Sequence, residues 1–279
     1  AFNANPFTAD WRDIISGLGW GLGYFGMPHI LVRFMAIKKS SMVKKSATVA
    51  ITWLIITLGA AILIAFLARN YLFSDGTALS ALLLPTGNQQ NVFINVVKDI
   101  FPGFIAGVIL SAIIAASMST ADSQLLVASS SFASDIYKPL IRKNNASDKE
   151  MLWVGRIVVL IVSVVAFFIA SSGLNSTGSW ASNIMAMVEN AWGLFGAAFG
   201  PVVILSLFWK RFNYAGAVAG ILAGAIADIA WLVLFTSTVT DAVICNTGVY
   251  EILPGFIAGA IVAVIVTLCT KAPNDAVLE

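Results

Sequence analysis

Long apolar stretches recur along the whole chain, and each has the length that a helix needs to cross a lipid bilayer. A transmembrane helix takes about 20 consecutive, mostly apolar residues. Hydrophobic residues make up 59% of the sequence and charged residues only 11%, whereas soluble domains carry roughly 25% charged residues. So few charges cannot cover a core of this size with a surface that water wets. The sequence therefore predicts an all-α integral membrane protein.

We predict seven transmembrane helices, forming a single transmembrane domain over residues 1–279. The third and fifth are long enough to be tilted, bent or to extend beyond the bilayer. The more polar stretch between the second and third is expected to carry a short surface helix around Asn91–Lys98. The predicted spans are Ile14–Ile37, Ala47–Asn70, Phe101–Ile136, Met151–Ser171, Trp180–Trp209, Ala215–Thr236 and Tyr250–Thr270.

Lysine and arginine are distributed very unequally between the two sets of loops. One set holds only Arg12, Arg69 and Lys98, and Arg156 lies inside the fourth span. The other set holds Arg33, Lys38, Lys39, Lys44, Lys45, Lys138, Arg142, Lys143, Lys149, Lys210, Arg211 and Lys271. Positive residues concentrate in cytoplasmic loops. We therefore expect the N-terminus outside the cell and the C-terminus in the cytoplasm.

Charge and composition also exclude several classes of function. The net charge is only +2, so nothing in the balance of charges indicates a nucleic-acid partner. The chain has one histidine, His29, and its two cysteines lack the spacing of a zinc site. One histidine and scattered carboxylates supply no nucleophile–base or metal constellation. We therefore predict neither a catalytic site nor an enzyme.

The first predicted span is rich in residues that interrupt helices. Five glycines and Pro28 lie within residues 17–28; glycine weakens a helix, and proline removes a hydrogen-bond donor. In transporters, such breaks expose backbone groups that bind ions and substrate near the middle of the membrane. Trp20 and Tyr24 are four residues apart and share the helix face before the break. Alternatively, the glycines only permit close helix packing, and the aromatic residues lie at the membrane interface.

The third predicted span carries a stripe of small and hydroxyl-bearing residues. Ala116, Ser119, Thr120 and Ser123 recur at the spacing of one helix face. Two hydroxyls and the carbonyl one turn earlier offer three neutral oxygens, which suit a hard cation such as sodium. Alternatively, the hydroxyls donate hydrogen bonds to carbonyls of their own helix or link neighbouring helices.

A charge within a membrane span is costly and usually functional, and four ionisable residues within the predicted spans are candidates for such a role. Asp122 could tune an ion site, pair with a cation or face an inner aqueous vestibule. Glu189 and Asp228 raise the same question in the fifth and sixth spans. His29 follows the break and could be a pH-sensitive gate or a hydrogen-bonded structural residue. Their roles stay open at this stage.

Several longer segments resemble the solute:sodium symporter family, and within it the transporters of proline. The resemblance runs through essentially the whole chain, and the combination of motifs is specific. The matching segments are Gly19–Met35, Ser119–Leu126, Ala191–Pro201, Ser206–Arg211 with Gly216, Gly220 and Gly224, and Tyr250–Phe256. Met27 departs from the glutamine common in the proline transporters.

The resemblance implies a leucine-transporter-like fold, built from two inverted repeats of five helices. On that pattern, this chain would hold the second repeat and two further C-terminal helices. The first repeat would be absent, and the missing N-terminal helices of the same protein would supply the remaining ligands of the ion and the substrate.

The resemblance also implies roles for individual residues. Trp20 and Tyr24 match positions implicated in proline binding, and Gly107 matches a glycine that packs near the substrate. Ser119 and Thr120 match the hydroxyls that bind the sodium ion, Na+, and Ala116 matches the carbonyl donor. Asp122 and Ser123 differ between relatives and are kept as possible ion-site or coupling residues.

The function implied by the family is sodium symport of proline by alternating access, in a bacterial inner membrane. Membrane lipid is the expected surrounding. Another small solute, such as pantothenate, is the alternative substrate. A symporter-like input domain of a membrane sensor is a different class of function, disfavoured because no kinase segment follows Glu279.

Overall fold

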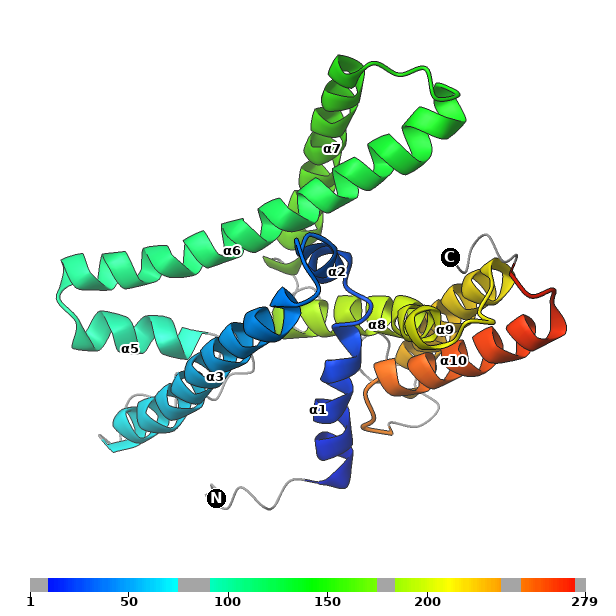
Figure 1. Ribbon diagram of the computed structural model, residues 1–279. Coiled ribbons are helices and arrows are strands. Elements are labelled where there is room, and N and C mark those ends of the chain that lie inside the picture. Colours follow the sequence, from blue (N-terminus) through cyan, green and yellow to red (C-terminus); the bar gives the residue numbers. More distant parts are fainter. Residues whose placement is uncertain (1–9, 75–90, 175–183, 237–246, 274–279) are drawn as a thin grey trace. The chain divides into compact units, whose positions relative to one another are not determined.

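The computed structural model describes residues 10–74, 91–174, 184–236 and 247–273, and these contain helices and no strands (Figure 1). The chain divides into two compact units, and each is described by itself. The bundle unit comprises Ala1–Arg33 and Phe168–Glu279, and the hairpin unit comprises Phe34–Phe167.

Six described helices are long and apolar enough to cross a membrane, which confirms the prediction of an all-α integral membrane protein. The hairpin unit also has the short helix α5, Val92–Ile100, close to the predicted surface helix. The hairpin unit's long helices are α3 (Met42–Ser74), α6 (Gly103–Ser131), which continues as the π-helix η3 (Phe132–Ile141), and α7 (Asp148–Leu174). The bundle unit's long helices are α8 (Ile184–Phe208), α9 (Tyr214–Phe235) and α10 (Ile252–Cys269).

The first predicted span differs from the others because it is divided into two helices. The helix α1 covers Trp11–Gly23, and α2 covers Pro28–Met35. The residues between them include Gly26 and Met27, which are both buried. The predicted interruption is therefore present, and the first of the seven predicted spans consists of two helices rather than one continuous helix.

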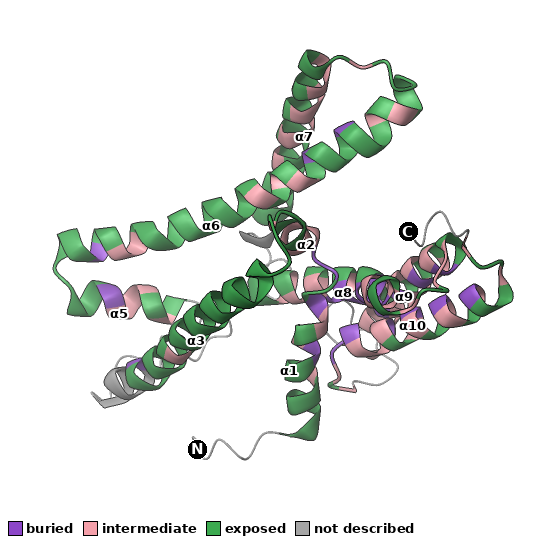
Figure 2. Ribbon diagram, in the orientation of Figure 1, coloured by how far each residue is buried: buried purple, intermediate pink, exposed green. Residues whose placement is uncertain are grey.

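Close packing of glycines joins the three long helices of the bundle unit. Gly216, Gly220 and Gly224 recur every four residues along α9, the spacing that lets two helix backbones approach each other. A Cβ atom added at Gly220 would lie 2.8 Å from the Cβ of Ala263 on α10. One added at Gly224 would collide with the backbone of Ala197 on α8. Most of the buried residues of the unit accordingly lie along α8, α9 and α10 (Figure 2).

Polar contacts bring the end of α10 against the turn between α8 and α9. The side chain of Asn213 donates to the carbonyl of Lys271 at 2.8 Å and accepts from the backbone N–H of Gly216 at 2.9 Å, which caps α9. The guanidinium of Arg211 donates to the carbonyl of Leu268 at 3.2 Å. Arg211 and Lys271 therefore lie at the same end of the unit, as the distribution of charges predicts.

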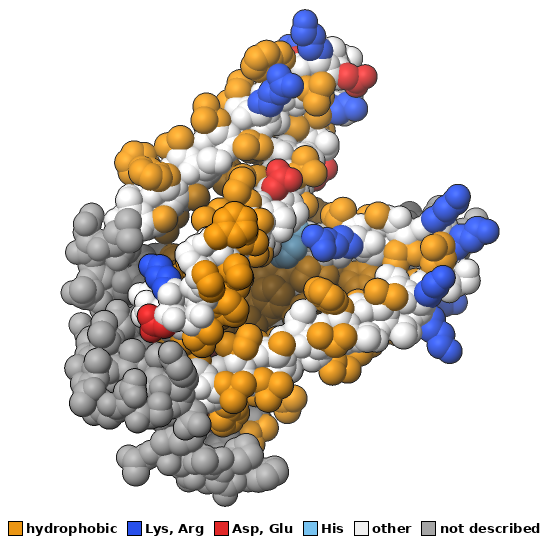
Figure 3. Space-filling model, turned by 90° about the vertical axis from the view of Figure 1, so that its left-hand side faces the viewer, with side chains coloured by type: hydrophobic (Ala, Val, Ile, Leu, Met, Phe, Trp, Pro, Cys, Tyr) orange, Lys and Arg blue, Asp and Glu red, His pale blue; other side chains and the backbone are white. Residues whose placement is uncertain are grey.

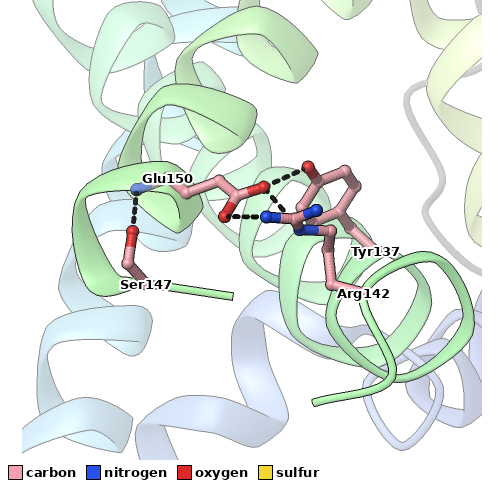
Figure 4. A network of polar contacts seen from close by, with 4 residues as sticks. All are labelled: Tyr137, Arg142, Ser147 and Glu150. Carbon is pink, nitrogen blue, oxygen red and sulfur yellow. Dashed lines mark hydrogen bonds and ion pairs between the residues drawn. The ribbon is translucent and has the colours of Figure 1, made fainter. Parts of the chain in front are cut away.

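In the hairpin unit, a polar network closes the turn between η3 and α7 (Figure 4). The hydroxyl of Tyr137 donates to Glu150 at 2.6 Å, and Arg142 forms an ion pair with the same carboxylate at 2.8 Å. Lys143 and Asn144 adopt positive φ angles of 48° and 66°, which reverse the chain. Most of the lysines and arginines between the third and fourth predicted spans lie in or beside this turn.

The flanks of the long helices are covered by apolar side chains, and Lys and Arg gather at helix ends (Figure 3). Within the described part of the hairpin unit, the apolar windows of α3 and α7 have no buried residue. These helices are therefore stable only where lipid or other protein segments cover them.

Candidate functional site

The break between α1 and α2 is a tight turn held by the backbone. The N–H of Gly26 donates to the carbonyl of Gly23 at 2.9 Å, and the N–H of Phe25 donates to that of Leu22 at 3.3 Å. These bonds span three residues and so tighten the last turn of α1. Pro28 then begins α2, where its missing N–H costs no helical hydrogen bond.

The glycines of α1 fall into two sets with different surroundings. A Cβ atom added at Gly23 would overlap the indole of Trp192, and one at Gly26 would overlap the backbone of Phe195. Atoms added at Gly17 or Gly21 would meet nothing within 4 Å. The first set therefore permits α1 and the turn after it to lie directly against α8, as the packing interpretation predicts for these glycines.

Gly23→Ala is expected to destabilise the protein by about 1–3 kcal/mol, because overpacking forces neighbouring groups to move. The matched control is Gly21→Ala on the same helix, which adds the same methyl group in open space. Thermal unfolding of the purified full-length protein measures both effects. Equal melting temperatures for the two variants would contradict the close approach of α1 to Trp192.

Four aromatic side chains meet beside the break. The ring of Trp20 stacks on that of Trp192, with centroids 5.8 Å apart, and lies 5.9 Å from that of Tyr250. The ring of Tyr24 meets Trp192 edge-on at 4.9 Å. The indole N–H of Trp192 donates to the carbonyl of Trp20 at 2.9 Å. Half of Tyr24 stays exposed, so the cluster presents an open aromatic edge.

Two members of this cluster, Trp192 and Tyr250, had no predicted role. Both lie in segments that carry the family resemblance, but neither shares a helix with Trp20, so no spacing in the sequence links them. The hydroxyl of Tyr250 donates to the carbonyl of Glu189 at 2.7 Å, and its N–H donates to Ser16 at 3.1 Å. Tyr250 therefore joins α8, α10 and α1.

In the hairpin unit, the predicted sodium residues form a compact group of oxygens on α6. The hydroxyls of Ser119 and Thr120 both donate to the carbonyl of Ala116, at 2.9 and 3.2 Å. The hydroxyl of Ser123 donates to the carbonyl of Thr120 at 2.9 Å and to that of Ser119 at 3.2 Å. The hydrogen bonds within the helix that the sequence offered as an alternative are thus present.

These hydrogen bonds do not prevent the same oxygens from binding a cation. A hydroxyl has two lone pairs and a hydrogen that rotates freely, so its oxygen can face an ion while the hydrogen turns elsewhere. Ser119 and Thr120 are exposed in this chain, and the face that they form is open. A hard cation prefers such oxygen ligands and takes about six of them, so this group supplies part of a coordination shell.

Other predicted residues lie on open parts of the same helix. An added Cβ at Gly107 would meet nothing within 4 Å, and Asp122 is exposed. The aromatic cluster belongs to the bundle unit and the oxygen group to the hairpin unit. The aromatic part and the oxygen-bearing part of the predicted site therefore belong to different units, and each is described within its own unit.

The remaining ionisable residues of the spans lie in the bundle unit. Asp228 on α9 is buried, with 1% of its surface exposed. Glu189 on α8 and His29 on α2 are partly exposed. Asp228 is therefore enclosed by its helices rather than by an aqueous vestibule.

Comparison with known proteins identifies the family. The model of the sodium:solute symporter family matches residues 4–224. This chain belongs to the sodium:solute symporter family. It is 43% identical over 94% of its length to the sodium/proline symporter of Escherichia coli K12, of which it covers 48%. It is 41% identical over 95% of its length to the osmoregulated proline transporter OpuE of Bacillus subtilis 168, covering 49% of that protein.

The sodium/proline symporter of Haemophilus influenzae Rd is similar to the same extent, with 40% identity over 95% of this chain and 50% of that protein. The chain thus spans about half the length of the curated relatives that it matches. Its family membership agrees with the resemblance carried by the broken first span and the α6 hydroxyls.

Proposed function

We propose that the full-length protein takes up proline together with sodium by alternating access. The observation that carries the proposal is the convergence of three oxygens on α6, those of Ala116, Ser119 and Thr120. The names of the similar proteins support both sodium and proline. The aromatic cluster at the α1–α2 break supports a site for a small, partly apolar solute.

The proposed sodium site needs more ligands than α6 alone provides. The described residues leave Ser119 and Thr120 exposed, and the chain covers about half of its relatives. We expect the other ligands to come from helices of a first inverted repeat, which would precede this chain in the full-length protein. This chain would then be the second repeat and two C-terminal helices, with Gly107 close to the substrate. Asp122 and Ser123 are candidates for coupling.

The energy available is sufficient for concentrative uptake. Moving one charge across 100 mV provides about 2.3 kcal/mol, and a tenfold sodium gradient adds about 1.4 kcal/mol. At a ratio of one sodium ion to one solute molecule, accumulation of a few hundredfold follows.

The proposed setting is a bacterial cytoplasmic membrane, because the similar proteins come from bacteria. The basic ends of the helices would face the cytoplasm. That orientation puts the α8–α9 turn and the turn between η3 and α7 on the inner side, with the N-terminal end of α1 outside.

Uptake of labelled proline into vesicles that contain the full-length protein tests this function. We expect uptake to require a sodium gradient and unlabelled proline to compete more effectively than pantothenate. Competition by pantothenate alone would identify a different solute, and uptake that persists equally without sodium would contradict symport.

A further inference from the structure

Two carboxyl groups lie close to the same glycine inside the bundle unit, whereas the proposed sodium residues belong to the hairpin unit. Asp228 lies on α9, and Glu251 precedes the first turn of α10; their exposed fractions are 1% and 3%. A Cβ atom added at Gly193 on α8 would lie 3.2 Å from Oδ1 of Asp228 and 3.3 Å from Oε1 of Glu251. The two oxygens therefore border one small space above the backbone of Gly193.

Neither of these oxygens has a hydrogen-bond partner among the described residues. Two other ionisable groups belong to the surrounding helices: Glu189 on α8 and Tyr250, whose hydroxyl donates to the carbonyl of Glu189. On α1, which belongs to the same unit, Arg12 and Asp13 are exposed. In the part of the chain that the structure describes, neither Asp228 nor Glu251 forms an ion pair with a basic side chain.

A buried pair of carboxylates without a counter-charge is strongly unfavourable, since each loses its hydration and repels the other. The positive end of α10 offsets only about half a charge. Buried acidic groups in membrane proteins are compensated by a partner of opposite charge or by a bound cation. The two unpartnered oxygens border the same space, so a compensating cation would lie there.

We propose that Asp228 and Glu251 form a buried site for one monovalent cation, either a proton or a sodium ion, held between the two carboxyl groups beside Gly193. The site consists of other residues than Ser119 and Thr120, and the proposal does not depend on their role. Its neighbours in sequence, Trp192 and Tyr250, contact Trp20. The cation would therefore hold α8 and α10 in the arrangement that packs against the broken helix.

Infrared difference spectroscopy of the purified full-length protein tests this site through the carbonyl band of protonated carboxyl groups. In sodium-free buffer at neutral pH, the wild type is expected to show such a band. Asp228→Asn and Glu251→Gln are each expected to change its position or intensity, and the two substitutions together are expected to remove it. If added sodium leaves the band unchanged, the resident cation is a proton. If sodium removes the band from the wild type, the site binds sodium.

Substitutions elsewhere provide the controls. Asp135→Asn removes an exposed carboxylate from η3 and should leave the band unchanged. Gly193→Ala would place a methyl group within 3.3 Å of both oxygens and should shift or remove the band, whereas Gly17→Ala adds the same group in open space. A wild type with no protonated-carboxyl band in sodium-free buffer, or a band that both Asp228→Asn and Glu251→Gln leave intact, would overturn the proposal.

Discussion

Thr120→Ala is expected to raise the sodium concentration for half-maximal proline uptake by at least about tenfold. The substitution removes one of three oxygens grouped on α6. A contact between an oxygen and a charged group that is as strong as a hydrogen bond contributes about 1.5–3 kcal/mol. A difference of about 1.4 kcal/mol corresponds to a factor of ten in affinity. Uptake by full-length protein in vesicles, measured over a range of sodium concentrations, gives this value. Ser119→Ala should act in the same direction.

Two control variants separate loss of the ligand from loss of a helix hydrogen bond. Thr120→Ser keeps the hydroxyl and should retain sodium dependence close to that of the wild type. Thr57→Ala removes a hydroxyl from α3 that donates to the carbonyl of Trp53 at 2.9 Å, the same kind of bond within a helix. An unchanged requirement for sodium in Thr120→Ala and Ser119→Ala would remove both residues from the sodium site.

Trp20→Ala is expected to raise the proline concentration for half-maximal uptake by about tenfold or more. The variant deletes an aromatic face beside the break, and burying an apolar surface of that size contributes about 1.5–3 kcal/mol. Because Trp20 also stacks on Trp192, the amount of folded protein in the membrane must be measured alongside uptake.

The comparison of half-saturation with maximal rate distinguishes substrate contact from a structural role. If Trp20 contacts the substrate, its removal raises the half-saturating proline concentration, and Trp20→Phe should bring that concentration most of the way back to the wild-type value. A purely structural defect lowers the amount of protein and the maximal rate instead. Trp11→Ala, at the exposed start of α1, is the matched control. The same half-saturating concentration for Trp20→Ala and the wild type would place the substrate elsewhere.

The sequence predicted the helical architecture well because the physical signals are local. Apolar length alone located six spans, with ends that differ by a few residues from the helices. Glycine and proline predicted an interruption within residues 17–28, and the structure places it between Gly23 and Pro28. The start of α3 at Met42 lies about a turn before the predicted span, because Lys44 and Lys45 are helical although they are too polar for a membrane core.

The tertiary contacts could not be predicted in the same way, because they depend on how helices pack. No spacing in the sequence indicates that Gly23 meets Trp192, or that Asp228 and Glu251 border the same space at Gly193. Conversely, the single face of Ala116, Ser119 and Thr120 follows directly from helical periodicity. The sequence therefore predicts sets of functional residues that share one helix, and the structure adds the sets that are assembled from several helices.

Direct binding of radioactive sodium to the purified full-length protein tests the central claim, because it measures the ion without requiring transport. We expect the wild type to bind sodium saturably in the absence of solute. The double variant Ser119→Ala/Thr120→Ala should lose binding at sodium concentrations that nearly saturate the wild type, and Thr57→Ala should retain it. Equal sodium affinity in the double variant and the wild type would contradict the assignment of these α6 hydroxyls to the coupling-ion site.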